Sequence, residues 1–336
     1  MVKVALIGAT GYTAYESINI LLRHPQAQVT YLTALPDECG PITKIFPALV
    51  GRLDLPVEPA DLEKLSHRAD VALCCLPHKV SMQFVPKLLA AGVKVVDFSA
   101  DYRLHDAALY EKIYQTPHTD QANIARAAFG LPELFRPRII GADLVANPGC
   151  YPTAACLALA PLLQEKFIAP DDIVINAVSG VSGAGRKADP AFHFPEMNEN
   201  IFAYAVGAHR HMPEIEQILT DFIGAAVQVL FQPHVAGMDR GICETIYCQP
   251  LKDLTGDELE HLYRDFYAAE PFVRVLNCPP KTKDVTFTNF CDIFAAPVKG
   301  KVVVFSTIDN LIKGAAGQAV QNLNLICNLP ETMGLL

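Results

Sequence analysis

Short apolar runs alternate with segments of helical period over roughly the first 150 residues. "KVALIG", "VTYLTA", "ADVALCCLP" and "KVVDFS" have the apolar, β-branched character of strands, and "YESINILLRH" and "VSMQFVPKLLAAG" have the spacing of helices. Strands that are nearly continuously apolar and alternate with helices are typical of a parallel sheet covered on both faces. This half of the chain therefore predicts an α/β fold.

The pattern changes from about Ile173 onward, where longer strands follow one another with fewer helices between them. "DIVINAVSG", "VQVLFQPHV", "GICETIYCQPL" and "APVKGKVVVF" are the clearest of these strands, and the last contains the glycine turn of a hairpin. We expect a second domain with a mixed or antiparallel sheet and helices on one side. The final segment, Asp309 to Leu329, is rich in small residues and again has a helical period.

A glycine-rich turn follows the first predicted strand, in "LIGATGYTAYE". Gly8, Gly11 and Ala14 stand three residues apart at a junction between strand and helix. Such a junction lets a pyrophosphate approach the peptide N–H groups at the helix N-terminus. The turn predicts dinucleotide binding, and the alternative is an ordinary glycine-rich connection.

The end of the second predicted strand bears on the choice of dinucleotide. In folds that select NAD, an acidic residue at this point holds the ribose 2′-hydroxyl. Here the strand ends with Thr33 and Ala34, and the first acidic residue is Asp37. The absence of an acid favours NADP slightly, although no arginine stands there either.

Cys150 lies between a Pro-Gly turn and an apolar run, in "NPGCYPTAACLALAPLL". This sequence predicts that Cys150 is near the first turn of a helix, where a thiolate is stabilised. Cys150 is therefore a candidate nucleophile. Cys156, inside the apolar run, is by contrast a packing residue.

Two histidines, His209 and His211, flank Arg210 just before a helix that begins near Pro213. An arginine between them makes a poor metal site, so acid/base chemistry is the better functional interpretation. For either histidine alone, a loop side chain bonded to a backbone carbonyl is an equally good explanation.

Three arginines are candidates for binding an anionic substrate. Arg103 follows a strand at the carboxyl edge of the predicted sheet, Arg186 ends the small-residue loop "VSGVSGAGRKA", and Arg240 follows "HVAGM". Each of them is also explained as a solvated surface charge.

Composition excludes several classes of protein. The 336-residue chain carries a net charge of −9 and no Lys/Arg run longer than two residues, which argues against nucleic acid as a partner. No apolar segment is long enough to span a bilayer, and no leader precedes the first strand, so we expect no membrane partner and a cytoplasmic location. The ten cysteines are expected to be thiols, and no metal site is predicted.

Five motifs together resemble one enzyme family. "GATGYTAYE", "ANPGCYPTAA", "SGVSGAGRKA", "HRHMPEI" and "DNLIKGAAGQAVQ" occur in the order and at the separations of the N-acetyl-γ-glutamyl-phosphate reductases of arginine biosynthesis. The resemblance runs from Lys3 to Leu329. The "PGCYPT" and "HRHxPEI" pair is far more specific than the glycine turn.

The resemblance implies two domains, as in aspartate-semialdehyde and glyceraldehyde-phosphate dehydrogenases. Residues 1–148 and 309–336 would form a Rossmann-type, doubly wound NADP-binding domain, and residues 149–308 an α+β catalytic and oligomerisation domain. The small-residue C-terminal helix would return to the first domain. Members of the family are usually homodimers or homotetramers.

The resemblance also implies a mechanism and a set of site residues. Cys150 would attack the γ-acyl phosphate to give a thioester, hydride from NADPH would reduce it, and His211, ahead of His209, would serve as acid/base. Substrate ligands would be Arg103, Asn147, Ser179, Arg186 and Arg240. Cofactor ligands would be Gly8, Ala9, Thr10, Gly11, Tyr12, Thr13, Thr33, Leu76, Pro77, His78, Ser182, Gly183 and Asn310.

The sequence departs from the family after "LT" in the second strand, where relatives tend to have Ser or Arg and this chain has "ALPDECG". The residue that would bind a 2′-phosphate is therefore not identified beyond Thr33. Two other functions stay open at this point. One is a reductase of a related acyl phosphate, of the aspartyl or aminoadipyl type, and the other is a dinucleotide-binding sensor without turnover.

Overall fold

The computed structural model describes residues 1–336 and divides into two units. Unit 1 comprises Met1–Pro148 and Ala315–Leu336, and unit 2 comprises Gly149–Gly314. Residues 309–314, which the sequence assigned to the first domain, group with unit 2 in the structure. One reason is local, because Asp309 and Asn310 bond to Arg240 and Gly241 within unit 2.

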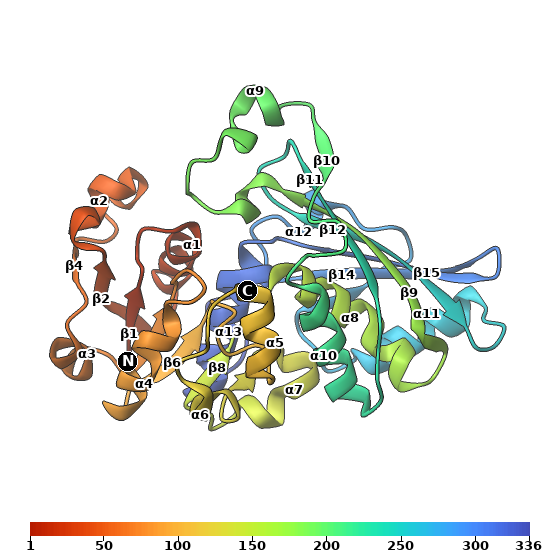
Figure 1. Ribbon diagram of the computed structural model, residues 1–336, viewed down its shortest axis with the longest axis horizontal. Coiled ribbons are helices and arrows are strands. Elements are labelled where there is room, and N and C mark those ends of the chain that lie inside the picture. The colour runs from red at the N-terminus through yellow and green to blue at the C-terminus, as the bar shows by residue number, and fades with distance from the viewer. The chain divides into compact units, whose positions relative to one another are not determined.

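Unit 1 is built on an eight-stranded sheet with the order β3-β4-β2-β1-β5-β6-β8-β7 (Figure 1). Every neighbouring pair is parallel except β3 and β4, so the predicted α/β class is confirmed. All four residues of β5 are buried, as expected for a strand covered on both faces. The strands are β1 (Val2–Ile7), β2 (Ala27–Ala34), β3 (Gly40–Pro41), β4 (Pro56–Pro59), β5 (Val71–Cys74), β6 (Lys94–Asp97), β7 (Ala128–Phe129) and β8 (Leu144–Ala146).

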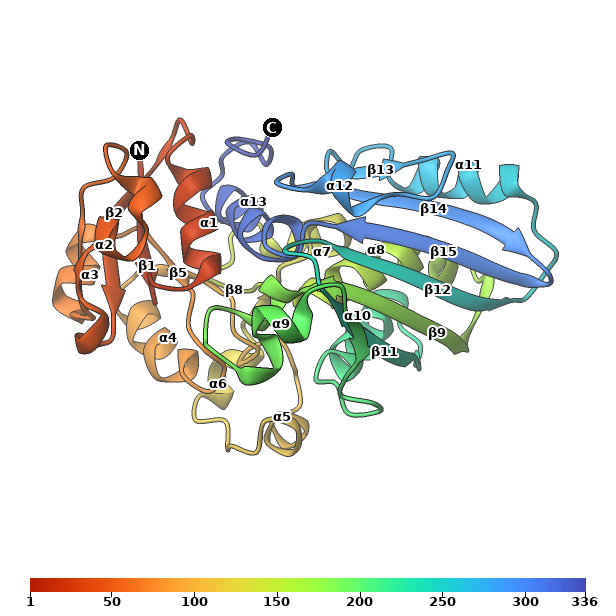
Figure 2. The same cartoon turned by 90° about the horizontal axis from the view of Figure 1, so that it is seen from above.

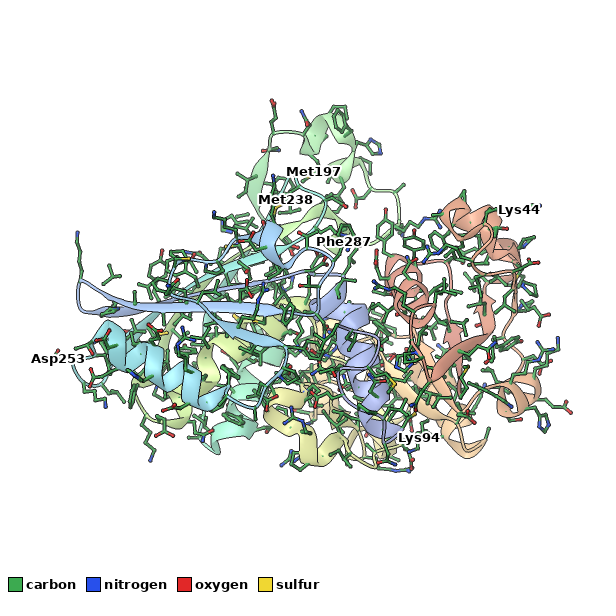
Figure 3. The ribbon with its side chains drawn as sticks, turned by 180° about the vertical axis from the view of Figure 1, so that it is seen from behind. Lys44, Lys94, Met197, Met238, Asp253 and Phe287 are labelled. Carbon is green, nitrogen blue, oxygen red and sulfur yellow. The ribbon has the colours of Figure 1, made fainter.

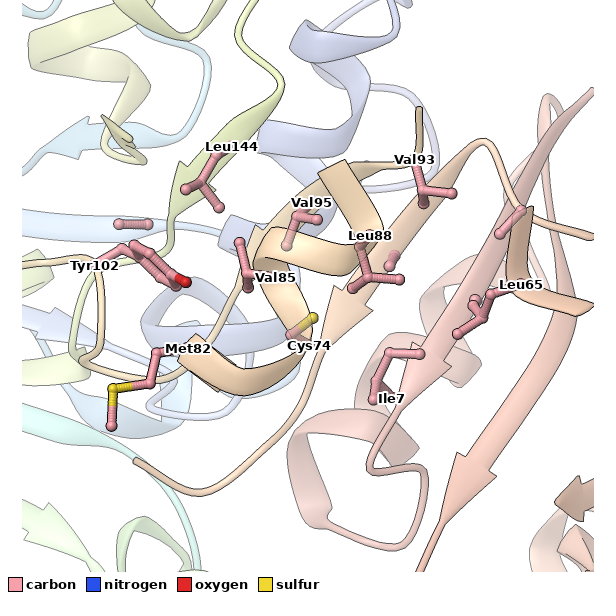
Figure 4. Packing of buried hydrophobic residues seen from close by; sticks show 14 of the residues in the cluster. Ile7, Leu65, Cys74, Met82, Val85, Leu88, Val93, Val95, Tyr102 and Leu144 are labelled. Carbon is pink, nitrogen blue, oxygen red and sulfur yellow. The ribbon is translucent and has the colours of Figure 1, made fainter. Parts of the chain in front are cut away.

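Helices cover both faces of this sheet. Figure 2 shows α1 and α13 on one side of β1 and β5 and α4 on the other. In Figure 4, Val85 and Leu88 of α4 pack on Ile7, Cys74 and Val95 of the sheet. The helices of unit 1 are α1 (Tyr12–Leu21), α2 (Ile42–Ile45), α3 (Leu62–Arg68), α4 (Ser81–Ala90), α5 (Ala107–Tyr114), α6 (Gln121–Ile124), α7 (Pro132–Ile139) and α13 (Gly317–Ile326).

The C-terminal segment is fastened into unit 1 by polar bonds as well as by packing. Every residue of α13 is buried. Lys94, labelled in Figure 3, donates to the Ile326 carbonyl at 2.7 Å, and His24 Nε2 lies 2.9 Å from Asn324 Oδ1. The helix starts later than the pattern predicts. A π-helical turn, Ile312–Ala316, precedes it, and Asp309 holds the entry by accepting from the Leu311 and Ile312 N–H groups.

Unit 2 contains a seven-stranded mixed sheet with the order β10-β11-β9-β12-β15-β14-β13 (Figure 2). Burial alternates along β12, which indicates that helices cover one face and leave the other uncovered within the chain. The strands are β9 (Ile168–Gly180), β10 (Ile201–Ala203), β11 (Leu230–Ala236), β12 (Ile242–Pro250), β13 (Val273–Val275), β14 (Cys291–Val298) and β15 (Lys301–Ile308). The helices are α8 (Cys150–Gln164), α9 (Phe194–Met197), α10 (Met212–Ile223), α11 (Gly256–Phe266) and α12 (Thr282–Val285).

Helix α8 is the centre of unit 2. All residues from Tyr151 to Leu163 are buried, and the helix packs across β9, β12 and β15. Tyr263 donates its hydroxyl to the Ala158 carbonyl, and Ser306 donates to the Ala154 carbonyl at 3.2 Å. Although α8 is apolar, no helix of the chain combines the length and hydropathy needed to cross a membrane. Its burial holds the N-terminal residue, Cys150, in a fixed position.

Candidate functional site

The glycine turn of unit 1 has a conformation that requires glycine at its first position. Gly8 has φ +86°, and a Cβ atom there would lie 2.6 Å from the Cys75 carbonyl oxygen. The N–H groups of Gly8 and Ala9 both donate to the Thr33 carbonyl, at 2.9 and 2.8 Å. Gly8, Ala9 and Thr33 therefore shape the turn, and the N–H groups of Gly8 and Ala9 are already used within the protein.

The N-terminus of α1 is the part of this turn that fits a phosphate group. Gly11 is the N-cap residue and contributes no side-chain cap. The N–H groups of Tyr12, Thr13 and Ala14, in the first turn, have no intrahelical acceptor. Such groups, with the positive end of the helix dipole, bind anions such as a pyrophosphate.

A carboxylate that the sequence analysis missed lies beside this turn. Glu38, in the short 3₁₀ helix after β2, accepts a 2.9 Å hydrogen bond from the Thr10 hydroxyl. The sequence-based prediction of the cofactor depends only on the end of β2, at Thr33 and Ala34, where an acidic residue would hold the ribose 2′-hydroxyl of NAD. The signal was available, because "PDE" follows within four residues of Ala34.

The loop between β5 and α4 contains the predicted cofactor residues Leu76, Pro77 and His78. His78 accepts the Ala100 N–H on Nδ1 at 2.9 Å. The buried carboxylate of Asp101 accepts from the Lys79 and Met82 N–H groups, at 2.7 and 3.1 Å. The segment after β6 therefore fixes this loop. Asp101 was not among the predicted site residues, although it stands two residues before the predicted Arg103.

Two predicted substrate residues in unit 1 are bonded to the protein itself. Arg103 is buried and donates to the Asn147 and Phe98 carbonyls, at 2.8 and 2.6 Å. The Asn147 side chain donates to the Ala315 carbonyl and accepts from Asn322. Arg103 thus ties the segment after β6 to the segment after β8, and Asn147 ties the latter to α13.

In unit 2, Cys150 is the first residue of α8, and Gly149 is its N-cap. Gly314 lies against it, because a Cβ atom on Gly314 would come within 2.8 Å of the Cys150 Cβ. The Gly149 N–H donates to the buried carboxylate of Glu214 at 2.8 Å. Glu214 is in the first turn of α10, three residues after His211, so this bond connects the cysteine's helix to the histidines' helix.

His209 and His211 lie in an aromatic cluster next to the cysteine. Their rings are 4.8 Å apart, and the Tyr151 ring is 5.6 Å from His209 and 5.9 Å from His211. His209 Nε2 is 3.4 Å from the Tyr204 hydroxyl, and His209 Nδ1 accepts the His211 N–H at 3.1 Å. The structure therefore brings both predicted histidines to the residue that follows Cys150.

The two histidines differ in their surroundings. Burial, and next the neighbouring charge of Arg210, lowers the pKa of His209 to about 4. Burial also raises the pKa of Tyr204, and the charge of Cys150 contributes to that increase. His209 is therefore neutral at pH 7, and Tyr204 lies within electrostatic reach of Cys150.

The remaining predicted residues of unit 2 form a bonded framework around the start of β12. Asn310 accepts from the Gly241 N–H at 2.8 Å and donates to the Ser182 hydroxyl at 3.1 Å. Ser182 donates to the Asp239 carbonyl at 2.6 Å. Arg240 pairs with the buried Asp309 carboxylate at 3.0 Å, and Phe287, labelled in Figure 3, covers its guanidinium at 4.3 Å.

The rest of this loop differs in exposure. Ser179 is buried and donates to the Gly180 carbonyl at 3.0 Å. Gly183 and Arg186 are exposed in the segment that follows β9. Of the three predicted substrate arginines, Arg186 is exposed, Arg103 is buried, and the Arg240 side chain is largely buried.

Beneath α8 lies a buried acid that the sequence did not single out, Glu244 of β12. Its side chain is fully buried and neither carboxyl oxygen has a hydrogen-bond partner. Burial raises the pKa of Glu244 well above its usual value and so favours the protonated carboxyl in the folded protein. Burial, and next the charge of Glu214, also raises the pKa of Cys156 well above its usual range, which keeps that thiol unreactive.

We expect Glu244→Gln to change the pH dependence of stability. Above the unfolded pKa of about 4.3, the unfolded chain loses this proton while the folded chain keeps it. The free energy of unfolding therefore falls with rising pH, by at most about 1.4 kcal/mol per unit, until the folded pKa is passed. The variant should gain stability over the wild type progressively from pH 5 to 7, measured by urea unfolding. Exposed Glu165→Gln is the control, and an equal Glu244→Gln effect at every pH would contradict the assignment.

Two family models match the chain in sequence order. The semialdehyde dehydrogenase NAD binding domain matches residues 3–142, and the semialdehyde dehydrogenase dimerisation domain matches residues 150–310. The first lies within unit 1, and the second within unit 2. Together they account for most of the chain.

Solved structures with the same fold include aspartate-semialdehyde dehydrogenases. Aspartate semialdehyde dehydrogenase II of Vibrio cholerae, complexed with ASA, gives a TM-score of 0.75 at 15% identity and covers 98% of both chains. The Candida albicans enzyme with NADP gives 0.75 at 15% identity, covering 97% of this chain and 98% of that one. At these identities the similarity establishes the fold.

Relatives at higher identity extend over the whole chain. The N-acetyl-gamma-glutamyl-phosphate reductase of Desulforudis audaxviator is 50% identical over 100% of this chain and 98% of its own. That of Citrifermentans bemidjiense is 48% identical with the same coverage, and that of Rhodopirellula baltica is 45% identical over 99% and 98%. The chain therefore belongs to the N-acetyl-gamma-glutamyl-phosphate reductase family of semialdehyde dehydrogenases.

Proposed function

We propose that this protein reduces N-acetyl-γ-glutamyl phosphate with NADPH, giving N-acetylglutamate 5-semialdehyde and phosphate in arginine biosynthesis. The observation that carries the proposal is the position of Cys150. It is the first residue of a deeply buried helix, beside two histidines, in a chain 50% identical to a reductase of this name. A sensor without turnover would need neither the thiol nor the histidines.

The chemistry begins with the thiol. A helix N-terminus favours the thiolate form, and the Glu214 bond to the Gly149 N–H fixes the peptide that precedes Cys150. The Cys150 sulfur attacks the γ-acyl carbon, and the bond between that carbon and the phosphate oxygen breaks. Inorganic phosphate departs, and the acyl group remains on Cys150 as a thioester. Bound reduced dinucleotide supplies the hydride. The thiohemiacetal on Cys150 then releases the aldehyde, and the sulfur regains its electron pair.

The histidine geometry supports His211 as the acid/base. An efficient acid/base group titrates near the working pH, and a pKa of about 4 makes His209 a weak base at neutrality. His209 accepts the His211 N–H and contacts the Tyr204 hydroxyl, so its role is to position His211. His211 takes the thiol proton before attack and holds the oxyanion of the tetrahedral states.

Unit 1 supplies a fitting site for the dinucleotide. The glycine turn leaves room for a pyrophosphate, and Tyr12, Thr13 and Ala14 present N–H groups to it. The absence of an acidic residue at the end of β2 supports NADP. If the enzyme used NAD instead, Glu38, which lies beside Thr10, is the carboxylate that would bind the ribose 2′-hydroxyl. We further propose that the enzyme is a homodimer or homotetramer in the cytoplasm, supported by the matched dimerisation domain.

The substrate assignment is tested by the reverse reaction. With inorganic phosphate present, NADP should be reduced when N-acetylglutamate semialdehyde is added, and much less when aspartate semialdehyde is added. Absorbance at the wavelength of reduced nicotinamide follows the reaction. Turnover with aspartate semialdehyde or an aminoadipate analogue alone would replace the proposed substrate with that one.

The cofactor preference is tested by comparing kcat/KM for NADPH and NADH. We expect a preference for NADPH in the wild type. Removing the carboxylate in Glu38→Gln should raise that preference, because a negative charge beside the glycine turn repels a 2′-phosphate. Preference for NADH in the wild type, lost in Glu38→Gln, would show that the enzyme selects NAD.

A further inference from the structure

A cavity of about 640 Å³ lies within unit 1, and none of the site residues discussed above lines it. It is formed by the start of α5, the end of α6, the approach to β7 and the end of α7. This volume is within the range of small-molecule sites, about 300–1,000 Å³. Its lining residues are His105, Ala107, Gln121, Ile124, Ala125, Arg126, Ala127, Ala128 and Arg138.

The two arginines of this cavity, Arg126 and Arg138, are both exposed residues. Arg126, Arg138 and His105 line it, and no aspartate or glutamate does. Arg126 donates to the Asn123 side-chain oxygen at 3.0 Å, and the Arg138 guanidinium lies 5.8 Å from the centre of the Phe135 ring. Neither arginine forms an ion pair with a carboxylate. In a chain of net charge −9, two uncompensated guanidinium groups at one cavity indicate an anionic ligand.

Within unit 1, the sheet topology distinguishes the arginines of this cavity from the glycine turn. Arg126 comes two residues before β7, and Arg138 six residues before β8, so both precede the amino ends of parallel strands. The glycine turn follows the carboxyl end of β1, and Cys150 follows the carboxyl end of β8. The two arginines therefore lie toward the edge of the sheet opposite to the one where open α/β sheets bind their substrates, whereas His105 and Ala107 reach the cavity from the segment that follows β6.

We infer that this cavity is a second ligand site, and that it takes a small phosphorylated metabolite. Guanidinium groups recognise phosphate through paired, charge-assisted hydrogen bonds, and two arginines match the double negative charge of a phosphomonoester. The carbon skeleton of the ligand would lie on Ile124, Ala127 and Ala128, the apolar part of the lining. No residue of the proposed reaction contributes to this site.

Calorimetric titration of the full-length protein with glycerol 3-phosphate tests the inference. Wild type should bind it saturably, and the double variant Arg126→Gln/Arg138→Gln should bind about tenfold more weakly or not at all. The matched control is Arg52→Gln, an exposed arginine of unit 1 outside the cavity, which should behave as wild type. Any binding at the catalytic groups is common to all three proteins, so the difference reports this cavity alone. Equal isotherms for the double variant and the wild type would overturn the inference.

A second variant distinguishes the contribution of the cavity's shape to binding from that of its two arginines. Ala125→Trp fills the space from an exposed position and leaves both guanidinium groups, so it should weaken glycerol 3-phosphate binding while the reductase kcat stays unchanged. Undiminished binding in Ala125→Trp would show that the arginines act as open surface charges. Citrate supplies the last comparison, because binding of citrate but not glycerol 3-phosphate would assign the site to polycarboxylates instead.

Discussion

Cys150→Ala is expected to lower kcat for reduction of the acyl phosphate by at least about 10³-fold, because no thioester can form without the sulfur. Neighbouring residues cannot replace it. The next cysteine along α8, Cys156, is fully buried, and its raised pKa keeps the thiol protonated. Folding should be preserved, since Cys150 is only partly buried at the end of the helix. Single-turnover measurement of phosphate release checks the chemical step directly.

The matched control is Cys156→Ala, which removes a sulfur from the same helix. It should retain kcat and lose about 1 kcal/mol of stability, because it leaves a small cavity in the packed interior. Iodoacetamide should alkylate Cys150 first, and acyl phosphate should protect it, as followed by peptide mass spectrometry. A Cys150→Ala protein that still turns over, or a Cys156→Ala protein that does not, would contradict the assignment of the nucleophile.

His211→Asn is expected to lower kcat by about 10²-fold or more, the usual contribution of a general acid/base. His209→Asn should have a smaller effect on kcat, because His209 supports His211 through a single hydrogen bond to its backbone. The pH dependence distinguishes the two roles. With a pKa of about 4, His209 does not titrate between pH 6 and 8, so His209→Asn should leave the shape of the kcat profile over that range unchanged.

The histidine prediction is measured by steady-state kinetics of both variants from pH 6 to 8. Equal small losses in the two variants would mean that neither histidine is the acid/base. If only His209→Asn changed the shape of the pH profile of kcat, His209 would be the acid/base and His211 the residue that positions it. Circular dichroism provides the control for folding, since His211 is buried at the start of α10 and its replacement affects the first turn.

The main elements of the fold were predictable because their apolar patterns are long and regular. β1, β2, β5 and β6 coincide with the predicted strands to within three residues at each end. β3 and β4 were missed, because Gly40–Pro41 and Pro56–Pro59 are short, rich in proline and without an apolar run. The C-terminal helix begins eight residues later than predicted, because the Asp309 side chain caps the backbone first.

The candidate site was predictable only where its evidence is local. Pro148 and Gly149 before an apolar run predict that Cys150 is near the first turn of a helix, and in the structure it is the first residue of α8. The bond between Gly149 and Glu214 spans 65 residues, and the edge-to-face contact of His209 with Phe231 joins a loop to β11. The bonds that hold Arg103 and Arg240 also come from distant segments. No periodicity along the chain encodes such pairings.

The interruption of unit 1 by unit 2 has a consequence for biosynthesis on the ribosome. Unit 2 is one continuous stretch, whereas unit 1 needs Ala315–Leu336, which is translated after unit 2. Until that segment emerges, the carbonyl of Gly130 lacks its hydrogen-bond donors Gln318 and Asn322, and the surface of unit 1 that α13 covers is exposed to solvent. Domains usually fold in the order in which they are made. Here the second unit completes first, and the nascent first unit is the species that chaperones would meet.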